Sequence, residues 1–123
     1  MRLGIVSFAH VHAQRYQTIL SSEPGIEAAG IYDEDETRGR EAAERFGTRF
    51  VPRLDELLSG GASGDPPDGV IVCSENSLHR AHCVAALEAG VHVLCEKPIA
   101  TTLDDARAIV DAAEANRGVL KIA

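Results

Sequence analysis

Residues 91–100 read VHVLCEKPIA, and this stretch decides the predicted fold. Its apolar half, residues 91–95, has the length and composition of a strand that is buried on both faces of a parallel sheet. The triplet Glu96-Lys97-Pro98 then ends the strand, and in open parallel sheets ligands bind at the carboxyl ends of the strands. The pattern therefore predicts that Lys97 lies where chemistry is done. The alternative is a surface turn with a solvated ion pair.

The alternation of short apolar runs with amphipathic helices continues on both sides of this stretch. Strands are predicted at residues 3–6, 26–32, 50–51, 70–73, 91–95 and 119–122. Helices are predicted at residues 13–23, 37–46, 54–58, 78–89 and 103–113. Such regular alternation predicts an α/β fold, a doubly wound parallel sheet of the Rossmann type with three αβα layers. The corresponding strand order is 3-2-1-4-5-6.

Local signals mark the ends of several of these elements. Residues 74–77 are expected to cap the helix that follows them, and Gly90 is expected to end that helix. Thr102, with Asp105 three residues later, predicts a second capped helix start. Residues 60–68, GGASGDPPD, are expected to form a surface loop.

Length and composition predict a single domain over residues 1–123, because 45% apolar content in 123 residues is enough for a core. The net charge of −7 and the pI near 5.1 disfavour nucleic acid and anionic membrane surfaces as partners. No apolar run of the sequence reaches membrane-spanning length. Three cysteines without C-x-x-C spacing, Cys73, Cys83 and Cys95, predict reduced thiols in a cytoplasmic protein.

A Glu-Lys-Pro triplet after a buried strand, preceded by a helix that ends in ALEAG at residues 86–90, resembles the Gfo/Idh/MocA family. This family comprises nicotinamide-dependent enzymes related to glucose-fructose oxidoreductase, inositol dehydrogenase and a rhizopine-catabolism protein. The resemblance extends over the whole chain, as the nucleotide-binding half only. It implies a C-terminal α/β substrate domain that lies outside these 123 residues. A homo-oligomer is compatible with the sequence.

The turn after the first strand is the expected binding site for the pyrophosphate of a dinucleotide. Its residues are Ser7, Phe8, Ala9, His10, Val11 and His12. The fingerprint G-x-G-x-x-G would place glycines at positions 7, 9 and 12, and all three are missing. Ser7 and Ala9 are nevertheless small, and the start of the next helix still offers N–H groups to an anion. His12 is bulky there, and a solvent-facing role at the helix start is its alternative to ligand binding.

Asp33 ends the second strand, where a carboxylate can bond both hydroxyls of an adenosine ribose. The acidic run over residues 33–36 would repel a 2′-phosphate, so NAD is predicted as the cofactor over NADP. Arg38 is expected to stack on the adenine or to offset part of the acidic charge. The alternative role for Asp33 is that of a helix cap.

The run SENSLH at residues 74–79 faces the first turn across the predicted crevice. It is similar to the Thr-Pro-Asn-x-x-His motif of the family, with Asn76 and His79 in matching places. The resemblance implies that Asn76 contacts the cofactor near the nicotinamide ribose, and Ser74 and His79 are candidates for the same site. Glu75 departs from the motif and would weaken pyrophosphate binding unless it points away or meets a cation. Its alternative role is a solvent-facing acid that the helix dipole favours.

Lys97 is the predicted catalytic residue. By resemblance it contacts the nicotinamide ribose or the substrate hydroxyl and helps to move the hydroxyl proton. A partly dry strand end would destabilise the charge of its amine and bring it closer to the proton-transfer range. Glu96 would orient Lys97 or hold the ribose, and a plain ion pair is the alternative. Pro98 restricts the backbone of Lys97 to an extended conformation.

The five histidines also raise the question of a metal site. His10 and His12 could meet His79 and His82 across the crevice, because both pairs follow the ends of neighbouring strands. This spacing is not a recognised zinc pattern, and histidines at helix starts are commonly structural. No metal is therefore predicted.

Together the residues and the resemblance predict an oxidoreductase in which NAD exchanges a hydride at C4 with a carbinol carbon of a sugar, polyol or related hydroxy compound. The domain alone is not expected to turn over a substrate. A regulatory or protein-binding module of the same fold is the second interpretation, because the turn glycines are missing. A structural Rossmann domain without a nucleotide is the third. The presence of Lys97 favours the enzyme.

Overall fold

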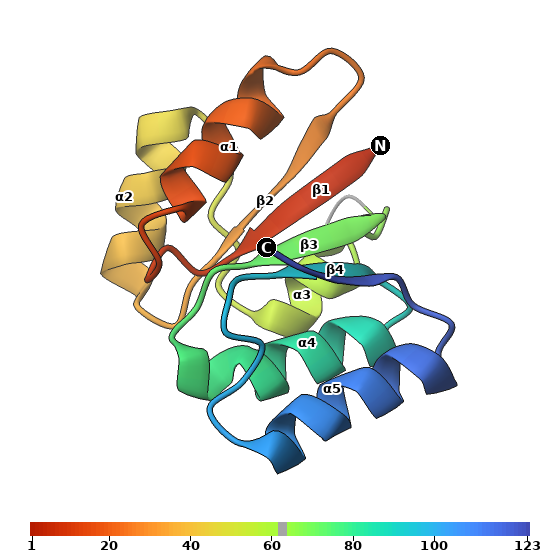
Figure 1. The fold of residues 1–123 in the computed structure, drawn as a ribbon. Helices are drawn as coiled ribbons and strands as arrows, with labels where there is room; N and C mark the ends of the chain where they lie inside the picture. The colour runs from red at the N-terminus through yellow and green to blue at the C-terminus, as the bar shows by residue number, and fades with distance from the viewer. Residues whose placement is uncertain (62–63) are drawn as a thin grey trace.

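The computed structural model of this chain describes residues 1–61 and 64–123. A parallel sheet of five strands in the order β2-β1-β3-β4-β5 runs through its centre (Figure 1). The strands are β1 (Arg2–Val6), β2 (Glu27–Tyr32), β3 (Gly69–Val72), β4 (His92–Cys95) and β5 (Leu120–Ile122). The helices are α1 (Ala13–Ser22), α2 (Glu36–Phe46), α3 (Leu54–Leu58), α4 (His79–Glu88) and α5 (Leu103–Ala115), with a 3-10 helix η2 (Asn76–Leu78) before α4.

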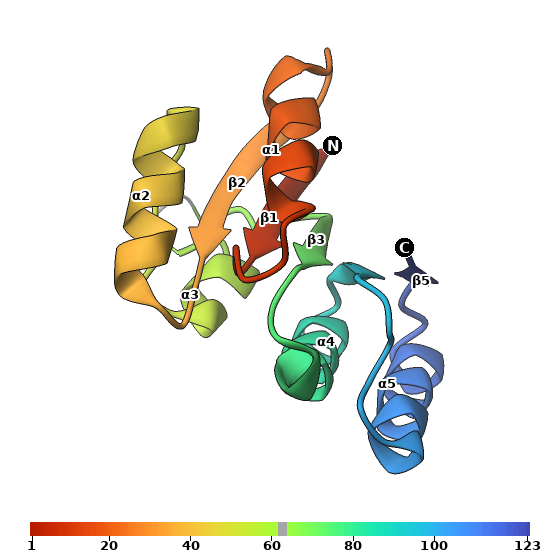
Figure 2. The same ribbon diagram turned by 60° about the vertical axis from the view of Figure 1, so that its left-hand side comes forward.

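The helices form a layer on each face of the sheet. On one face α1 and α2 bury Ala13, Leu20 and Ala42 in a cluster with strand residues such as Ile5. The other face is covered by α3, α4 and α5, as Figures 1 and 2 show. With helices on both faces of a parallel sheet, the predicted three-layer, doubly wound Rossmann fold is confirmed. None of the described helices is long and apolar enough to cross a membrane.

The predicted strand order is confirmed for five of its six members. The remaining one, predicted at residues 50–51, is not a strand, because it makes only a single parallel bridge, from Phe50 to Ile31 of β2. The Val51 N–H donates to the Ile31 carbonyl at 2.7 Å, and the Ile31 N–H donates to the Arg49 carbonyl at 2.9 Å. The next residue that could donate to β2 is Arg53, but Arg53 is already the N-cap of α3, so the pairing ends there. The segment still occupies the edge position that the predicted order assigns to it.

The two predicted helix caps have different outcomes. Thr102 is the N-cap of α5, and its hydroxyl accepts the Asp105 N–H at 3.1 Å and donates to the Asp105 carboxylate at 2.8 Å. The prediction that residues 74–77 cap α4 is wrong, because η2 intervenes and the N-cap of α4 is Leu78, which has no side-chain acceptor. The predicted loop at residues 60–68 includes residues 62 and 63, which lie outside the described residues.

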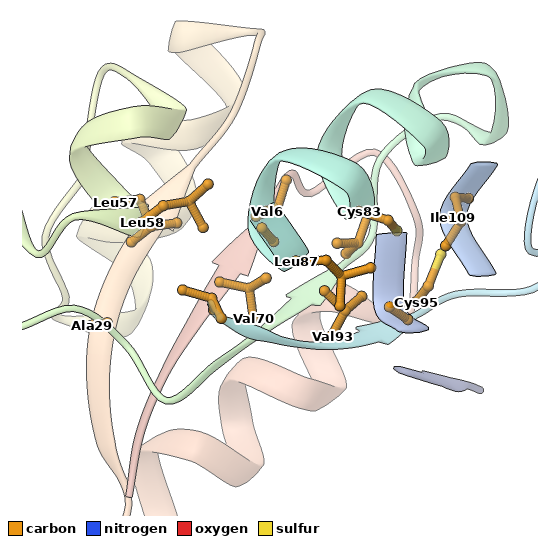
Figure 3. Close-up of a cluster of buried hydrophobic side chains, with 14 of the residues drawn as sticks. Val6, Ala29, Leu57, Leu58, Val70, Cys83, Leu87, Val93, Cys95 and Ile109 are labelled. Atoms are coloured by element: carbon orange, nitrogen blue, oxygen red, sulfur yellow. The ribbon is translucent and has the colours of Figure 1, made fainter. Parts of the chain in front are cut away.

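A large part of the apolar core lies between the sheet and α3, α4 and α5 (Figure 3). Leu87 and Ile109 are fully buried there, in one cluster with Val6, Val93 and Cys95 of the strands. Since the strands are parallel and in register, this core holds the carboxyl ends of β1, β3 and β4 at one edge of the sheet. That edge positions the candidate functional residues.

Gly39 marks a close contact between α2 and the segment beside β2. A Cβ atom at this position would lie 2.5 Å from a ring carbon of Phe50 and 2.8 Å from Cβ of Asp33. Replacing Gly39 by valine is therefore expected to lower the free energy of unfolding by about 2 kcal/mol through overpacking, as measured by urea denaturation. The control is valine at the exposed Glu41 of the same helix, with an expected cost of about 0.5 kcal/mol. Equal costs would contradict the tight contact.

Candidate functional site

The candidate site lies at the carboxyl edge of the sheet, where the loops of four neighbouring strands meet. Residues 7–12 follow β1, Asp33 follows β2, residues 73–75 follow β3, and residues 96–98 follow β4. The first and third of these loops are joined directly, because the backbone N–H of residue 10 donates to the carbonyl of residue 73 at 2.9 Å. The structure thus brings together the loops that the sequence assigns to one site.

The turn after β1 keeps the backbone shape of a glycine turn without a glycine. Ser7 has a φ of 70°, in the left-handed region that favours glycine, and it is fully buried. Its N–H donates to the Tyr32 carbonyl at 2.6 Å, and its hydroxyl accepts the Ala9 N–H at 3.3 Å. These bonds hold the serine in a conformation that costs about 1 kcal/mol. The backbone path at the first fingerprint position is therefore retained.

The start of α1 is open to an anion. Within the described residues, no side chain caps it at His12, and its first turn contains no acidic residue. The N–H groups of His12 and Ala13 are bonded to Nδ1 and to the carbonyl of His10, so the N–H groups that follow them in the first turn, together with the helix dipole, favour a negatively charged group at this point. Val11, directly before the N-cap, is 73% exposed. The helix start thus has the chemistry that a pyrophosphate needs.

Asp33 holds a network that joins β2 to the turn after β1. Its buried carboxylate accepts the Phe8 N–H at 2.7 Å and the Asp35 N–H at 3.0 Å. The guanidinium of Arg38 binds the same carboxylate through Nε at 2.9 Å and Nη2 at 2.6 Å. The alternative that Asp33 caps a helix is wrong, because Asp35 is the N-cap of α2 and accepts the Arg38 N–H at 3.0 Å.

Arg38 also connects loops across the crevice. Its Nη2 donates to the Ser7 hydroxyl at 3.1 Å and to the Glu75 carboxylate at 3.4 Å. The hydrogen bond with Asp33 raises the pKa of Arg38 further above its ordinary value, so the guanidinium stays charged. Glu75 therefore meets a cation, the condition under which a carboxylate near a pyrophosphate is tolerated.

Asn76 and His79 of the expected motif lie in different environments. Asn76 begins η2 and is exposed. His79 is fully buried, with Nδ1 2.9 Å from the Pro98 carbonyl and Nε2 3.1 Å from the Ser74 carbonyl. Burial alone would lower the pKa of His79, but hydrogen bonds with Cys95 and with these carbonyls raise it above its ordinary value. His79 therefore ties the loop after β3 to the loop after β4.

His82 forms a hydrogen bond with the side chain of Ser74. His82 is buried in α4, its Nδ1 lies 2.9 Å from the Ser74 hydroxyl, and its Nε2 pairs with the Glu34 carboxylate. Burial alone would raise the pKa of Glu34, but the bond with His82 and the charges of His82 and Arg38 lower it below its ordinary value. The acid that follows Asp33 is thus bound to α4.

The lowered pKa of Glu34 predicts a pH dependence of stability. A carboxyl group whose pKa is lower in the folded than in the unfolded chain stabilises the fold above the unfolded pKa, and this contribution is lost as the pH falls through the folded pKa. The free energy of unfolding is therefore expected to fall between about pH 5 and pH 3, and to fall less in Glu34→Gln. Urea denaturation at several pH values measures both slopes. Glu88→Gln, at an exposed position of α4, is the control, and an unchanged slope in Glu34→Gln would contradict the assignment.

Glu96 is the buried acid of the site, with 1% of its side chain exposed. Its Oε1 lies 2.8 Å from His12 Nδ1 and accepts the Tyr16 hydroxyl at 3.0 Å, whereas Oε2 accepts the Lys97 N–H at 3.2 Å. Burial alone would raise the pKa of Glu96, but the bonds with His12 and Tyr16 lower it. Burial and the bond to Glu96 raise the pKa of Tyr16 to about 12.

Tyr16 is a site residue that the sequence patterns do not reveal. The apolar spacing of the first helix accounts for this residue by its ring alone, yet its hydroxyl binds Glu96, 80 positions away. The sequence does contain one signal for this role, because His12 and Tyr16 are four residues apart and therefore share one helix face. Their common partner, Glu96, could not be identified from this spacing, since it follows a different strand, β4.

Lys97 is exposed, so the prediction of a partly dry environment for its amine is wrong for this domain. Its backbone N–H is bonded to Glu96, and no ion pair joins the two side chains within the described residues. The reason is geometric: the Glu96 carboxylate turns inward to His12 and Tyr16. Side chains of neighbouring residues in an extended segment point to opposite sides, which leaves Lys97 outside.

The predicted meeting of four histidines is also wrong. His79 and His82 are occupied by the carbonyls, hydroxyl and carboxylate described above. His10 and His12 meet Glu96 instead. The Nδ1 atom of His10 lies 3.9 Å from Glu96 Oε2, and the centroids of the two imidazole rings are 4.6 Å apart.

Two pockets bear on where a ligand binds. A groove of about 340 Å³ lies between α1 and α2, and Phe8, Gln14 and Arg38 are among its lining residues. A larger pocket of about 680 Å³ lies between α3 and the carboxyl end of α4, with Leu54 and Ala85 in its walls. This larger pocket is away from the carboxyl edge of the sheet. The polar loops at that edge, and not pocket size, therefore identify the candidate site.

Comparisons with known proteins agree with this assignment. The family model described as an oxidoreductase family with an NAD-binding Rossmann fold matches residues 1–123. Glucose-6-phosphate 3-dehydrogenase of Bacillus subtilis is 34% identical over 113 residues, which cover 92% of this chain and 30% of that protein. UDP-N-acetylglucosamine 3-dehydrogenase of Acidithiobacillus ferrooxidans is 33% identical, with 99% of this chain and 36% of the relative covered.

Solved structures give the same result. The structure of the Acidithiobacillus ferrooxidans enzyme matches this fold with a TM-score of 0.82. GenD2 from gentamicin A biosynthesis, in complex with NAD, is 27% identical, with a TM-score of 0.85 over 99% of this chain and 34% of its own. The chain spans about a third of the length of these relatives. With a family match over residues 1–123 and the four-loop edge in place, the chain belongs to the Gfo/Idh/MocA oxidoreductase family and has its NAD-binding Rossmann fold.

Proposed function

We propose that this domain binds a nicotinamide dinucleotide across the crevice at the carboxyl ends of β1 and β3 and serves an oxidoreductase reaction. The reaction is the exchange of a hydride between C4 of the nicotinamide and a carbinol carbon of a sugar, polyol or related hydroxy compound. The observation that carries the proposal is the turn at Ser7, whose φ of 70° keeps the shape of the glycine fingerprint. The names of the relatives, which are dehydrogenases of sugar compounds, support the substrate class.

The residues present fit the dinucleotide. Ser7 and Ala9 are small enough for the backbone to approach a pyrophosphate, and the uncapped start of α1 supplies N–H groups to it. The exposed Asn76 lies in the loop across the crevice, where it can reach the nicotinamide ribose. When bound, the nicotinamide ring supplies the site that accepts or donates the hydride. The domain's own task is to hold and orient that ring.

Within this proposal NAD is preferred over NADP. Asp35 and Glu36 add negative charge beside Asp33, and this charge repels a 2′-phosphate. The Asp33 carboxylate is bound by Arg38 at two points, through Nε and Nη2. To hold the ribose hydroxyls, Asp33 would exchange these bonds for bonds to the ribose, and Arg38 would be the residue that stacks on the adenine.

Lys97 is assigned the acid–base role, and the substrate domain is assigned the rest of the reaction. The Lys97 amine moves the proton of the substrate hydroxyl, while its backbone N–H helps to hold Glu96. Substrate recognition and a second acid–base group belong to a C-terminal α/β domain, in keeping with relatives about three times as long as this chain. Such a domain would cover the exposed Lys97.

Titration with NADH, followed by the fluorescence of the nicotinamide, tests the proposal. We expect saturable binding, with weaker binding of NADPH. Glutamate in place of the exposed Val11 puts a negative charge into the phosphate turn and is expected to weaken NADH binding about tenfold or more. The matched control is Ile19→Glu, at an exposed position near the other end of α1, which is expected to keep the affinity. No response at millimolar NADH, or equal losses in both variants, would overturn the proposal.

A further inference from the structure

The carboxyl edge also holds three side chains whose arrangement suits a different ligand. His10, His12 and Glu96 each offer one ligand atom, and these three atoms lie within 4.8 Å of one another. The distance from His12 Nδ1 to Glu96 Oε1 is 2.8 Å, and that from His10 Nδ1 to Glu96 Oε2 is 3.9 Å. Since the residues follow two different strands, β1 and β4, the fold and not the local sequence creates the cluster.

Two imidazoles and one carboxylate are a common ligand set for divalent transition metals. Zinc lies about 2.0–2.2 Å from such nitrogen and oxygen ligands, so its ligand atoms are about 3.4 Å apart in tetrahedral geometry. The separation of 2.8 Å between His12 and Oε1 is shorter than this value, the separation of 3.9 Å between His10 and the other oxygen, Oε2, is longer, and the three ligand atoms lie within 4.8 Å of one another. Only small movements are needed, and His12 and His10, with 49% and 22% of their side chains exposed, have room to make them.

The cluster also has the lone pairs that an ion requires. The His12 backbone N–H donates to His10 Nδ1 at 3.3 Å, so that nitrogen carries a lone pair, and the imidazole must turn away from this long bond to offer it to an ion. When an ion takes the place of the hydrogen bond between His12 and Glu96, the proton on His12 Nδ1 moves through water to Nε2, which leaves the Nδ1 lone pair to the ion. The Glu96 carboxylate offsets one of the two positive charges of the ion.

The buried carboxylate is oriented before any ion arrives. The Tyr16 hydroxyl donates to Oε1 of Glu96 at 3.0 Å, and the Lys97 backbone N–H donates to Oε2 at 3.2 Å. Hydrogen bonds of this kind from neighbouring groups hold a metal ligand in place and strengthen binding. Glu96 is therefore the fixed ligand around which the two histidines can adjust.

We propose that His10, His12 and Glu96 form a binding site for one divalent transition metal ion of the zinc class, with a fourth position open to water. Both histidines belong to the turn proposed for the pyrophosphate, and Glu96 borders the same crevice. An ion at this site and the dinucleotide therefore exclude each other, a consequence that rests on the proposed function. Zinc acts as an inhibitor of cofactor binding.

Titration of the metal-free protein with Zn²⁺ in a calorimeter, and with Co²⁺ followed by visible absorption, tests the site. We expect one ion per chain and the d–d bands of cobalt bound by nitrogen and oxygen. His10→Ala and His12→Ala are each expected to weaken Zn²⁺ binding about tenfold or more. The matched control is His92→Ala, an exposed histidine at the amino end of β4, which is expected to keep the affinity.

The site is overturned by any of three results: Zn²⁺ does not bind, the His10 and His12 variants bind it like the wild type, or the His92 variant loses as much affinity. Near-ultraviolet charge-transfer bands from thiolate to cobalt would assign the ion to the cysteines and overturn it too. With saturating Zn²⁺ the apparent Kd for NADH is expected to rise about tenfold or more. An unchanged Kd overturns the exclusion alone, whereas no NADH binding to the metal-free protein overturns the proposed function and leaves the Zn²⁺ result standing.

Discussion

Replacing Asp33 by alanine is expected to lower the free energy of unfolding by about 3 kcal/mol, as measured by urea denaturation. The fully buried carboxylate accepts the N–H groups of Phe8 and Asp35, and alanine leaves both donors without an acceptor. The substitution also removes the two-point ion pair with Arg38, which links α2 to the turn at Ser7. The substitution therefore weakens the contacts among the loops that follow β1, β2 and β3, the last of which is reached through the bond from Arg38 to Glu75.

Asp35→Ala is the matched control, because Asp35 is a nearby acid on the same loop and caps α2. Loss of an N-cap costs about 1 kcal/mol. An equal cost for the two substitutions would show that the Asp33 network does not stabilise the fold. The same pair separates stability from binding. At a temperature where both variants are folded, Asp33→Ala is expected to lose NADH binding and Asp35→Ala to keep it.

The strand order and the meeting of four loops could be predicted because strands buried on both faces of a parallel sheet leave few other arrangements. The strand predicted at residues 50–51 does not form, because an apolar pair alone does not determine how far a strand extends. Two apolar residues before Pro52 are enough to place a segment beside β2, and Ile31 does accept it. They are too few to form a ladder, since the chain enters α3 at Arg53 and Leu54, before a second pair of hydrogen bonds to β2 can form.

The site residues could be named from their positions after strands, but their partners could not. The contact between His12 and Glu96 joins residues 84 positions apart, and the Arg38–Asp33 pair depends on side-chain directions that spacing does not fix. The missing glycines misled for a similar reason. A sequence shows that position 7 is a serine, but it does not show that Ser7 takes up a φ of 70°. Loss of glycine was therefore weaker evidence against a nucleotide than it appeared in the sequence alone.

Lys97→Ala is expected to lower kcat about 10²–10⁴-fold in an enzyme that joins this domain to the proposed substrate domain, because it removes the amine that moves the hydroxyl proton. The Kd for NADH is expected to change little, since the Lys97 backbone N–H that holds Glu96 is kept. Steady-state kinetics with a hydroxy substrate and NADH titration measure the two effects separately. A loss of kcat without a loss of affinity distinguishes proton transfer from cofactor binding.

The control is Lys121→Ala, which removes the chain's other lysine at an exposed position of β5 and is expected to keep kcat. Added methylamine gives a second readout, because a small amine can replace a missing proton carrier but cannot repair a misfolded loop. We expect it to restore part of the turnover in Lys97→Ala and to leave the wild type unaffected. Full turnover without the Lys97 amine would instead mean that the proton is moved by a group of the substrate domain, and that this edge of the sheet only binds and orients the dinucleotide.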